Sequence, residues 1–510
     1  MSGIILSVDI GTSSLKAAFI DFDGHLKAFS RISYTADLNC KNGINCAGAE
    51  EWERSFVLAL DKLASISPGS KIEGVCISGN GPTLVPVTRE GRALQPLFWH
   101  DGKTFLPPEC GDALPGKKEY GETFPENKEC GEGFPGNKAV PEGKKSAESK
   151  ASGTGSFFLP HAAWLKKNSP GDYERISLFI SSHEWLAHRL GAEALTVLPQ
   201  ASYEPYYWDD EQCRLFNLER EKFPPFIKMG AIMGKVSQEA ALRLGGSGLK
   251  SGIPLIAGGP DFITALMGTG TWEPGDVCDR AGSSEGINVC SAVPVMAGGL
   301  RVLPHARKGF WNIGSVIPSS GRLFEWYRTA AGYEKKPYED LLADLIPSPG
   351  DVEIFRNIEF LPPAGTESFH LNSSLPASCS SLEFGRSLLC AIGFTVRNAV
   401  EALRARGFPI KEMKVSGGQG KNPRWNQLKA DIIGVPLMVP EIADGELAGN
   451  AVLAVSALDP CLNDMNAENT DSEEIRFSAA IERMIRIRDV YKPNAQTAAF
   501  WEDSFRQKII

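Results

Sequence analysis

The hydrophobic pattern begins with two mainly apolar stretches separated by a short polar turn. Residues 4–8 and 15–20 each predict a buried strand. A glycine and three hydroxyl residues stand between them, and Asp23-Gly24 predicts a further turn into a third strand over residues 25–33. The chain is therefore expected to open with antiparallel strands joined by tight turns.

The first of these turns carries residues suited to holding a phosphate. Gly11 tolerates backbone conformations that other residues resist, and the N–H groups of such a turn can point at an anion. Thr12 and Ser13 add hydroxyl donors, and Lys16 adds a positive charge. Asp9 ends the first strand, where a carboxylate could hold a hydrated Mg²⁺ beside a nucleotide phosphate. A strand follows rather than a helix, so this is not the P-loop of nucleotide-binding proteins; the alternative is an ordinary hairpin with a polar turn.

A second group of candidate residues follows the next strands. A strand is expected over residues 72–78, and turn residues including Asn80 then break it. Farther on, Trp99 stands beside Asp101 and Lys103. An aromatic face packs on sugar carbons while charged side chains bind hydroxyls, so the segment suits a sugar. The alternative is a strand end with a solvated turn.

Residues 105–155 differ in composition from the rest of the chain. Three decapeptides in succession, starting at residues 109, 119 and 129, repeat Gly, Pro and Lys at fixed places. The stretch has too few branched apolar residues to offset the entropy lost on ordering. We expect a flexible surface insertion with no catalytic role.

The strongest catalytic candidate stands where a strand is expected to meet a helix. A strand over residues 252–257 ends in Gly258-Gly259-Pro260-Asp261, and a helix is expected over residues 262–267. Ligand chemistry gathers at such junctions in α/β sheets. The helix terminus would keep the Asp261 carboxylate ionised and ready to accept a proton. The alternative is an N-cap aspartate without chemistry.

A second strand–turn–strand unit follows and echoes the first. Strands expected over residues 277–280 and 287–290 flank Gly282, Ser283 and Ser284. Two such turns, one in each half of the chain, indicate two similar domains that face one cleft. A nucleotide's phosphates could then be held from both sides, and closure would assemble the site.

Helical periodicity and a glycine-rich turn mark the remaining elements. Amphipathic helices are expected over residues 47–65 and 382–404. A strand over residues 413–415 runs into Gly417 and Gly418, followed by Asn422 and a helix. Glycines that let backbone approach a flat ring, followed by an amide, suit an adenine–ribose site; the alternative is a plain strand–helix turn. Last, Gly449 and Ala451 begin a small-residue helix that could pack tightly nearby.

Bulk properties narrow the class of protein. A chain of 510 residues is too long for one core, so two or more domains are expected. The net charge of −9 argues against nucleic-acid binding. We expect no signal peptide, because the first strand lacks a basic n-region. The sequence has no apolar run that could span a bilayer, and its 11 cysteines form no C-x-x-C pair. We expect a cytoplasmic protein with reduced thiols and no membrane contact.

Taken in order, these motifs resemble the FGGY carbohydrate kinases, and the xylulokinase-like branch looks closest. The resemblance covers nearly the whole chain except residues 105–155. It implies an α/β fold with two ribonuclease-H-like (actin-like ATPase) domains around an interdomain cleft. Residues 1–250 would form the sugar-binding N-terminal domain, and residues 251–510 the nucleotide-binding C-terminal domain.

The resemblance also implies an enzyme that transfers the γ-phosphoryl group of ATP to a sugar or polyol hydroxyl. Asp261 would be the general base, and Asp9 and Asp261 would hold Mg²⁺. The residues implied to hold the nucleotide are Gly11, Thr12, Ser13, Lys16, Gly282, Ser283, Ser284, Gly417, Gly418 and Asn422. The residues implied to contact the sugar are Asn80, Trp99, Asp101, Lys103, Asp261 and Phe262.

The sequence departs from the family pattern at four places, and all but the last, residues 365–368, touch the expected sugar pocket. Lys103 replaces an arginine, and the two cations differ in hydroxyl geometry. Asn80-Gly81-Pro82 stands where xylulokinases have Gln-Met-His, Phe262 replaces an amide, and residues 365–368 replace a G-E-R-x-P loop. A xylulose-like ketose is the leading substrate, although xylulose itself does not follow. The alternatives are an actin-like ATPase that binds protein and a catalytically weakened, sugar-responsive binding protein; homodimer formation is left open.

Overall fold

The structure is a computed structural model that describes residues 3–34, 47–99, 101–107, 155–245, 248–295, 299–317, 320–346, 358–361, 370–373, 379–463 and 472–509. Most of the predicted insertion and the segment 365–368 lie outside the described residues, so their roles stay predictions. In the described part of the chain, no helix is long and apolar enough to cross a membrane. The seven cysteines within it are all free thiols.

The first sheet contains the three strands expected at the start of the chain. Its order is β10-β11-β4-β1-β2-β3, and β1 pairs antiparallel with β2 and parallel with β4. Two of the strands that follow were also expected from the sequence. The bounds are β1 (Ile4–Ile10), β2 (Ser14–Asp21), β3 (Leu26–Ser33), β4 (Ile72–Gly79), β10 (Ile232–Lys235) and β11 (Pro254–Pro260).

The second sheet repeats this arrangement. Its order is β14-β15-β13-β12-β18-β19-β20, in which β12 pairs antiparallel with β13 and parallel with β18. The run β15-β13-β12-β18-β19 therefore matches the run β3-β2-β1-β4-β11 in order and direction. The expected duplication is confirmed. The bounds are β12 (Val277–Ala281), β13 (Glu285–Ser291), β14 (Arg301–Pro304), β15 (Trp311–Ile317), β18 (Met413–Ser416), β19 (Leu437–Pro440) and β20 (Ile487–Tyr491).

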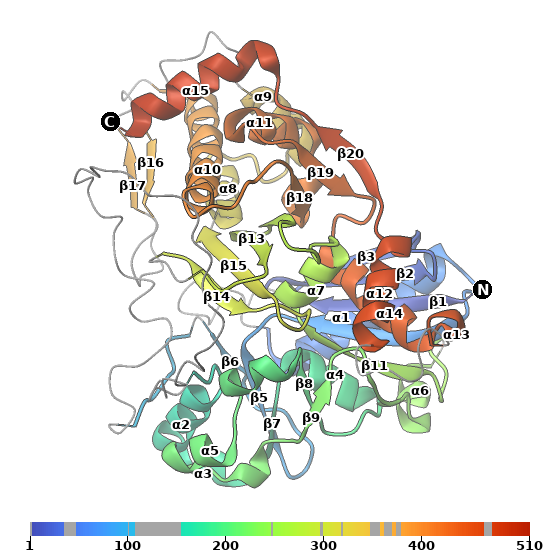
Figure 1. Cartoon of the computed structure of the whole chain (residues 1–510). Helices are drawn as coiled ribbons and strands as arrows, with labels where there is room; N and C mark the ends of the chain where they lie inside the picture. Colours follow the sequence, from blue (N-terminus) through green and yellow to red (C-terminus); the bar gives the residue numbers. More distant parts are fainter. Residues whose placement is uncertain are drawn as a thin grey trace, which may run out of the picture.

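Each sheet has its own hydrophobic core, and helices complete both (Figure 1). The expected amphipathic helices are α1 (Ala49–Ile66) and α10 (Ser381–Arg404). Because β11 belongs to the first sheet, that sheet extends past residue 250, and a domain division there stays a prediction. The other helices of the second half are α8 (Ser320–Ala330), α9 (Tyr338–Leu345), α11 (Pro423–Ile433), α13 (Pro460–Asn463), α14 (Ser472–Met484) and α15 (Ala495–Ile509).

The segment between β4 and β11 adds smaller elements to the first core. Its sheets have the orders β6-β5-β7 and β8-β9. The strands are β5 (Thr83–Thr88), β6 (Leu97–Phe98), β7 (Ile176–Ile180), β8 (Thr196–Leu198) and β9 (Phe226–Lys228). The helices are α2 (Leu159–Asn168), α3 (Pro170–Arg175), α4 (Ser182–Leu190), α5 (Asp210–Leu215) and α6 (Gln238–Arg243). A separate hairpin is formed by β16 (Ile358–Leu361) and β17 (His370–Ser373).

Two helices cross in backbone contact where the halves meet. These are α7 (Asp261–Gly268), which follows β11, and α12 (Gly445–Leu458), which follows β19 and packs on the first sheet (Figure 1). A Cβ added at Gly268 would lie 1.9 Å from the carbonyl oxygen of Gly445, and one added at Gly449 would lie 1.9 Å from that of Thr264. Only glycine fits at this crossing, so the small-residue helix expected from the sequence packs tightly as proposed.

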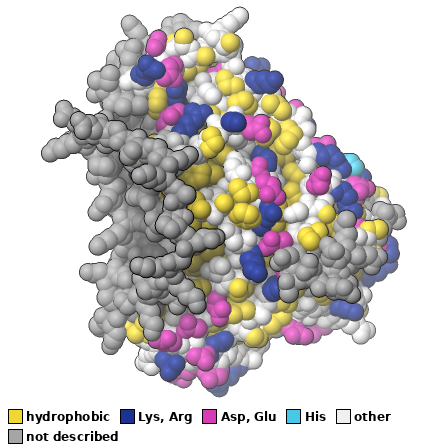
Figure 2. Space-filling view, in the orientation of Figure 1, with side chains coloured by type: hydrophobic (Ala, Val, Ile, Leu, Met, Phe, Trp, Pro, Cys, Tyr) yellow, Lys and Arg dark blue, Asp and Glu magenta, His cyan; other side chains and the backbone are white. Residues whose placement is uncertain are grey.

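Opposite charges are mixed over the molecular surface. On the described part of the face in Figure 2, acidic and basic side chains lie interspersed among apolar ones. This distribution accords with the modest net charge of −9.

Candidate active site

A large cleft brings most of the predicted site residues together. Its volume is about 1720 Å³, beyond the roughly 300–1,000 Å³ of an ordinary ligand pocket, so it has room for more than one ligand. Both glycine–hydroxyl turns and the start of α7 border it. The predicted residues that line it are Asp9, Gly11, Thr12, Ser13, Lys16, Asn80, Trp99, Asp261, Phe262, Gly282, Ser283, Ser284, Gly417, Gly418 and Asn422.

The structure does not place Asp101 or Lys103 among the lining residues. Asp101 Oδ2 accepts a hydrogen bond of 3.1 Å from the Phe98 N–H and lies 3.5 Å from Lys103 Nζ. The Lys103 ammonium lies 5.9 Å from the centre of the Trp164 ring. These contacts shape the turn after β6, and a sugar contact by either residue stays a prediction.

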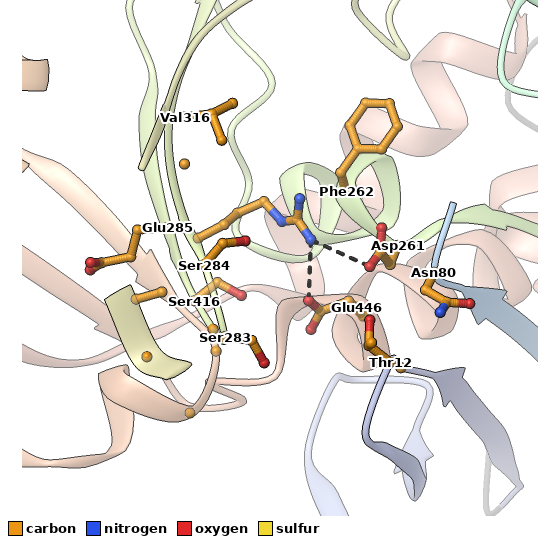
Figure 3. Close-up of a pocket in the computed structure, with 18 of the residues that line it drawn as sticks. Thr12, Asn80, Asp261, Phe262, Ser283, Ser284, Glu285, Val316, Ser416 and Glu446 are labelled. Carbon is orange, nitrogen blue, oxygen red and sulfur yellow. Dashed lines mark ion pairs between the residues drawn. The ribbon is translucent and has the colours of Figure 1, made fainter. Parts of the chain in front are cut away.

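The first turn is a tight hairpin between β1 and β2. The Gly11 N–H donates to the Ser14 carbonyl oxygen at 3.1 Å. A Cβ on Gly11 would lie 2.9 Å from that same oxygen, so a side chain here would force the turn open. Thr12 and Ser13 are exposed at its tip, and Figure 3 shows Thr12 reaching into the cleft.

The second turn has the same plan and is held from two sides. The Gly282 N–H donates to the Ser284 carbonyl oxygen at 3.0 Å, and the Arg322 N–H of α8 donates to the carbonyl oxygen of Ser283 at 3.1 Å. Gly417 has a φ of +98°, and a Cβ there would lie 2.5 Å from the carbonyl oxygen of Ala281. The backbone around Gly417 thus supports the turn directly.

Asp9 is a buried carboxylate at the floor of the cleft. Its side chain is almost fully covered, and Ser78 Oγ donates to Oδ1 at 2.9 Å. Burial raises the pKa of Asp9 to about 8, with Glu446 and Asp261 adding to the shift and Lys16 opposing it. Burial thus disfavours the charged form of Asp9, and a cation beside it would stabilise that form, which fits this donor set. Mg²⁺ commonly takes one or two carboxylates and completes its shell with water and phosphate oxygens.

Lys16 lies within a cluster of carboxylates. Its Nζ is 3.2 Å from Asp444 Oδ1 and 3.8 Å from both Asp9 Oδ2 and Glu446 Oε2. Burial alone would lower the pKa of Lys16, but the three carboxylates outweigh it and raise the pKa. Lys421 Nζ lies 2.5 Å from Asp444 Oδ2. Burial acts to raise the pKa of Asp444, yet Lys16 and Lys421 together lower it.

Asp261 and Arg280 face each other across the cleft. Arg280 belongs to β12 of the second sheet, and its Nη2 lies 3.7 Å from Asp261 Oδ2 and 3.7 Å from Glu446 Oε1 (Figure 3). Pro260, not Asp261, is the N-cap of α7, so the capping alternative does not hold. Burial raises the pKa of Asp261 while Arg280 acts to lower it. The helix terminus was expected to keep Asp261 ionised, and burial opposes that effect. Because its pKa is raised, the Asp261 carboxylate is a stronger base.

At the far end of the cleft, Asn422 has a structural role. Its Oδ1 accepts hydrogen bonds of 3.0 Å from the N–H groups of Arg424 and Trp425, which caps α11. Trp425 Nε1 donates to Gln419 Oε1 at 2.9 Å. A Cβ added at Gly418 would meet nothing within 4 Å, so this backbone is open to a ligand. The residues that form this strand–helix turn therefore also line the cleft.

Several charged residues of the cleft were missed from the sequence, among them Arg280, Asp444 and Glu446. Arg280 stands two residues before Gly282, as Asp9 stands two residues before Gly11, and that echo was a usable signal. Asp444 and Glu446 begin α12, where acidic residues commonly favour a helix N-terminus. Their position beside Lys16 depends on the crossing of α12 with the first sheet, which no local pattern encodes.

Comparisons with known proteins agree with this geometry. Residues 148–268 match the N-terminal domain of the FGGY family of carbohydrate kinases, and residues 280–458 match the C-terminal domain. The chain is 22% identical to a xylulose kinase of Bacillus subtilis (strain 168) over 88% of this chain and 87% of the relative. It is 28% identical to an L-fuculokinase of Escherichia coli O157:H7 over 59% of this chain and 65% of the relative.

Solved structures share the fold over the whole chain. A gluconate kinase from Lactobacillus acidophilus superposes with a TM-score of 0.71 at 18% identity, covering 99% of this chain and 96% of that one. A Plasmodium falciparum glycerol kinase with ADP gives 0.67 at 15% identity, covering 100% and 98%. The architecture is the two-domain actin-like ATPase fold. With both domain matches in sequence order around one cleft, the chain belongs to the FGGY family of carbohydrate kinases.

Proposed function

We propose that the chain transfers the γ-phosphoryl group of ATP to a hydroxyl of a sugar or polyol, with Asp261 as the general base. One observation carries the proposal. Two glycine–hydroxyl turns from two like-built sheets border the same cleft as Asp261. The names of the relatives span xylulose, fuculose, gluconate and glycerol, so a xylulose-like ketose is the first candidate among several.

In the proposed reaction, the acceptor hydroxyl oxygen attacks the γ-phosphorus as the bond to the β,γ-bridging oxygen breaks. The hydroxyl proton passes to the Asp261 carboxylate, and ADP leaves with the bridging oxygen. The raised pKa of Asp261 supports this role because a stronger base accepts the proton more readily. Proton transfer of this kind contributes about 10²–10⁴-fold in rate.

Charge on the transferred group would be met by Lys16, Arg280 and the N–H groups of the two turns. Lys16 and Arg280 flank the Asp261–Glu446 carboxylates from opposite sheets, because they belong to β2 and β12. Their contacts with Glu446 are 3.7–3.8 Å long and could be exchanged for phosphate oxygens, while Lys16 also lies 3.2 Å from Asp444. Preorganised positive groups are the main catalytic element in phosphoryl transfer.

The residues that would hold Mg²⁺ are Asp9 and Asp261. The charge of Asp261 helps to raise the pKa of Asp9, which supports the assignment because the two carboxylates lie close enough to share one cation. When bound, Mg²⁺ neutralises phosphate charge and orients the transferred group.

The domain built on the first sheet would bind the sugar, and the domain built on the second sheet would bind the nucleotide. Cytoplasmic location and formation of a homodimer stay predictions.

A coupled assay of ADP formation tests the proposal. Wild-type chain is incubated with ATP and Mg²⁺ and a panel of pentuloses, hexuloses, glycerol and alditols. We expect turnover with one or a few of them, lost in Asp261→Asn. ATP hydrolysis that ignores every sugar would favour an actin-like ATPase, and binding of ATP and sugar without turnover would favour a binding protein; either result contradicts the proposal.

A further inference from the structure

His183 lies on the sugar side of the cleft and takes no part in the mechanism above. It is the second residue of α4, a short helix whose N-terminus is closed by a capping box of Ser181 and Glu184. The Ser181 N–H donates to Glu184 Oε2 at 2.7 Å. The cap fixes the backbone of the first turn, and His183 with it, against the wall of the cleft.

The backbone of His183 is close to the proposed base. A Cβ added at Gly79 would lie 3.2 Å from the His183 nitrogen and 3.3 Å from its Cβ. Gly79 ends β4 and pairs with Pro260 of β11, the residue before Asp261. His183 therefore packs directly over the strand pair from which Asp261 and Asn80 emerge.

The imidazole of His183 is buried and has no hydrogen-bond partner among the described residues. The residue is 5% exposed, and neither Nδ1 nor Nε2 is bonded. Glu184 Oε1 lies 3.7 Å from Nε2, too far for a hydrogen bond, and accepts instead from the Val197 N–H at 2.7 Å. Burial lowers the pKa of His183 to about 3, so the ring is neutral and offers one donor and one acceptor.

Asn80 presents a matching polar group beside it. Asn80 Oδ1 accepts from Ser182 Oγ at 3.3 Å and from Thr83 Oγ1 at 3.4 Å. With its oxygen engaged by two hydroxyls, the amide has its NH₂ left for a ligand. Buried polar groups are costly when unpaired, so an unbonded imidazole next to a free amide marks a place for a polar ligand.

We propose that His183 binds a second hydroxyl of the substrate and thereby sets specificity for neutral polyhydroxylated acceptors. A hydroxyl both donates and accepts, which matches the two ring nitrogens. A carboxylate only accepts, so it could pair with the ring N–H but would leave the acceptor nitrogen of His183 without a partner, which disfavours a sugar acid with its acid group at this end. The inference rests on the proposed function, because it assumes that a sugar enters this side of the cleft.

The test compares His183→Ala and His183→Gln with His188→Ala. His188 lies on the same helix but is exposed, so it controls for substitution within α4. With the best acceptor of the panel, we expect His183→Ala to raise the KM for sugar about 10- to 100-fold. The KM for ATP should change less than about twofold, since the nucleotide side is untouched. Gln retains a donor and an acceptor and should restore part of the affinity; His188→Ala should match wild type.

A second measurement separates this inference from the proposed function. Calorimetry measures the Kd of the acceptor and of its deoxy analogues for wild type and both His183 variants. One deoxy analogue should bind about tenfold or more weakly to wild type, and that penalty should vanish in His183→Ala. If the penalty persists unchanged, or KM and Kd do not respond, the inference is overturned while the kinase proposal stands. If a polyol binds without turnover, the kinase proposal is contradicted, and the calorimetry still tests whether His183 binds a hydroxyl. If no polyol binds wild type, the kinase proposal and the inference about His183 are both contradicted.

Discussion

Lys429 of α11 is enclosed between two carboxylates behind the second turn. Its Nζ lies 2.7 Å from Asp279 Oδ2 and in direct contact with Glu285 Oε1, and all three side chains are fully buried. Asp279 and Glu285 lie on β12 and β13, on either side of the Gly282–Ser284 turn. Lys429 therefore ties both strands of this hairpin to α11.

Lys429→Met keeps most of the apolar stem and removes the charge. Two buried carboxylates are then left without a cation, and each already has one oxygen with no hydrogen-bond partner among the described residues. Removing one partner of a buried ion pair costs about 3–5 kcal/mol, because the remaining charge cannot be solvated. A domain is stable by only about 5–15 kcal/mol, so a large part of the stability would be lost.

Urea unfolding followed by circular dichroism measures this loss. Wild type and Lys429→Met are compared at 25 °C and pH 7, with a constant m-value as evidence that the unfolded states are alike. Lys336→Met serves as the control, because its pair with Asp344 is partly exposed and should matter far less. The triple variant Lys429→Met, Asp279→Asn, Glu285→Gln should recover much of the loss, since no unpaired charge remains.

A loss below about 1 kcal/mol in Lys429→Met would contradict the assigned role of Lys429, because leaving a buried charge uncompensated costs more free energy than that.

The contacts of Lys429 also bear on ligand binding. Loosening the hairpin should weaken ATP binding more than sugar binding, since the turn belongs to the nucleotide side of the proposed site. Equal weakening of both would contradict that assignment.

Three further predictions follow. Asp261→Asn should lower kcat about 10²–10⁴-fold with KM values within a few-fold of wild type, as measured by steady-state kinetics. Gly417→Ala should cost about 1–3 kcal/mol in urea unfolding because of the positive φ and the clash with Ala281, whereas Gly418→Ala, which has open space, should not. Burial raises the pKa of Asp279 to about 7, above its unfolded value, so native chain holds an extra proton and the free energy of unfolding should fall as pH rises from 5 to 8. Asp279→Asn should flatten that slope; a slope unchanged by the substitution would show that another group titrates.

The hairpins and the cleft were predictable because their signals are local. A glycine with hydroxyl residues between two apolar runs predicts a tight turn between strands, so the turns at Gly11 and Gly282 could be found and paired by their likeness. Asp261 was predictable for the same reason, since a strand, two glycines and a helix follow one another in the chain.

Other features depend on distant parts of the chain. Glu446 reaches Lys16 only because α12 returns to pack on the first sheet, and β11 joins that sheet from the middle of the sequence. In the sequence, Lys429 occupies one polar position of an amphipathic helix, but in the structure its side chain is completely buried. His183 is likewise one of seven histidines without ligand spacing, and only its buried, unbonded ring distinguishes it.

The central claim is that phosphate leaves ATP for a sugar and not for water. ATP labelled in its γ-phosphate, incubated with Mg²⁺, the wild-type chain and the best acceptor, measures this directly. We predict that the label appears in an acidic sugar product in proportion to the ADP formed, and that Asp261→Asn slows the transfer about 10²–10⁴-fold. Label recovered as inorganic phosphate, at a rate that no sugar alters, would contradict it.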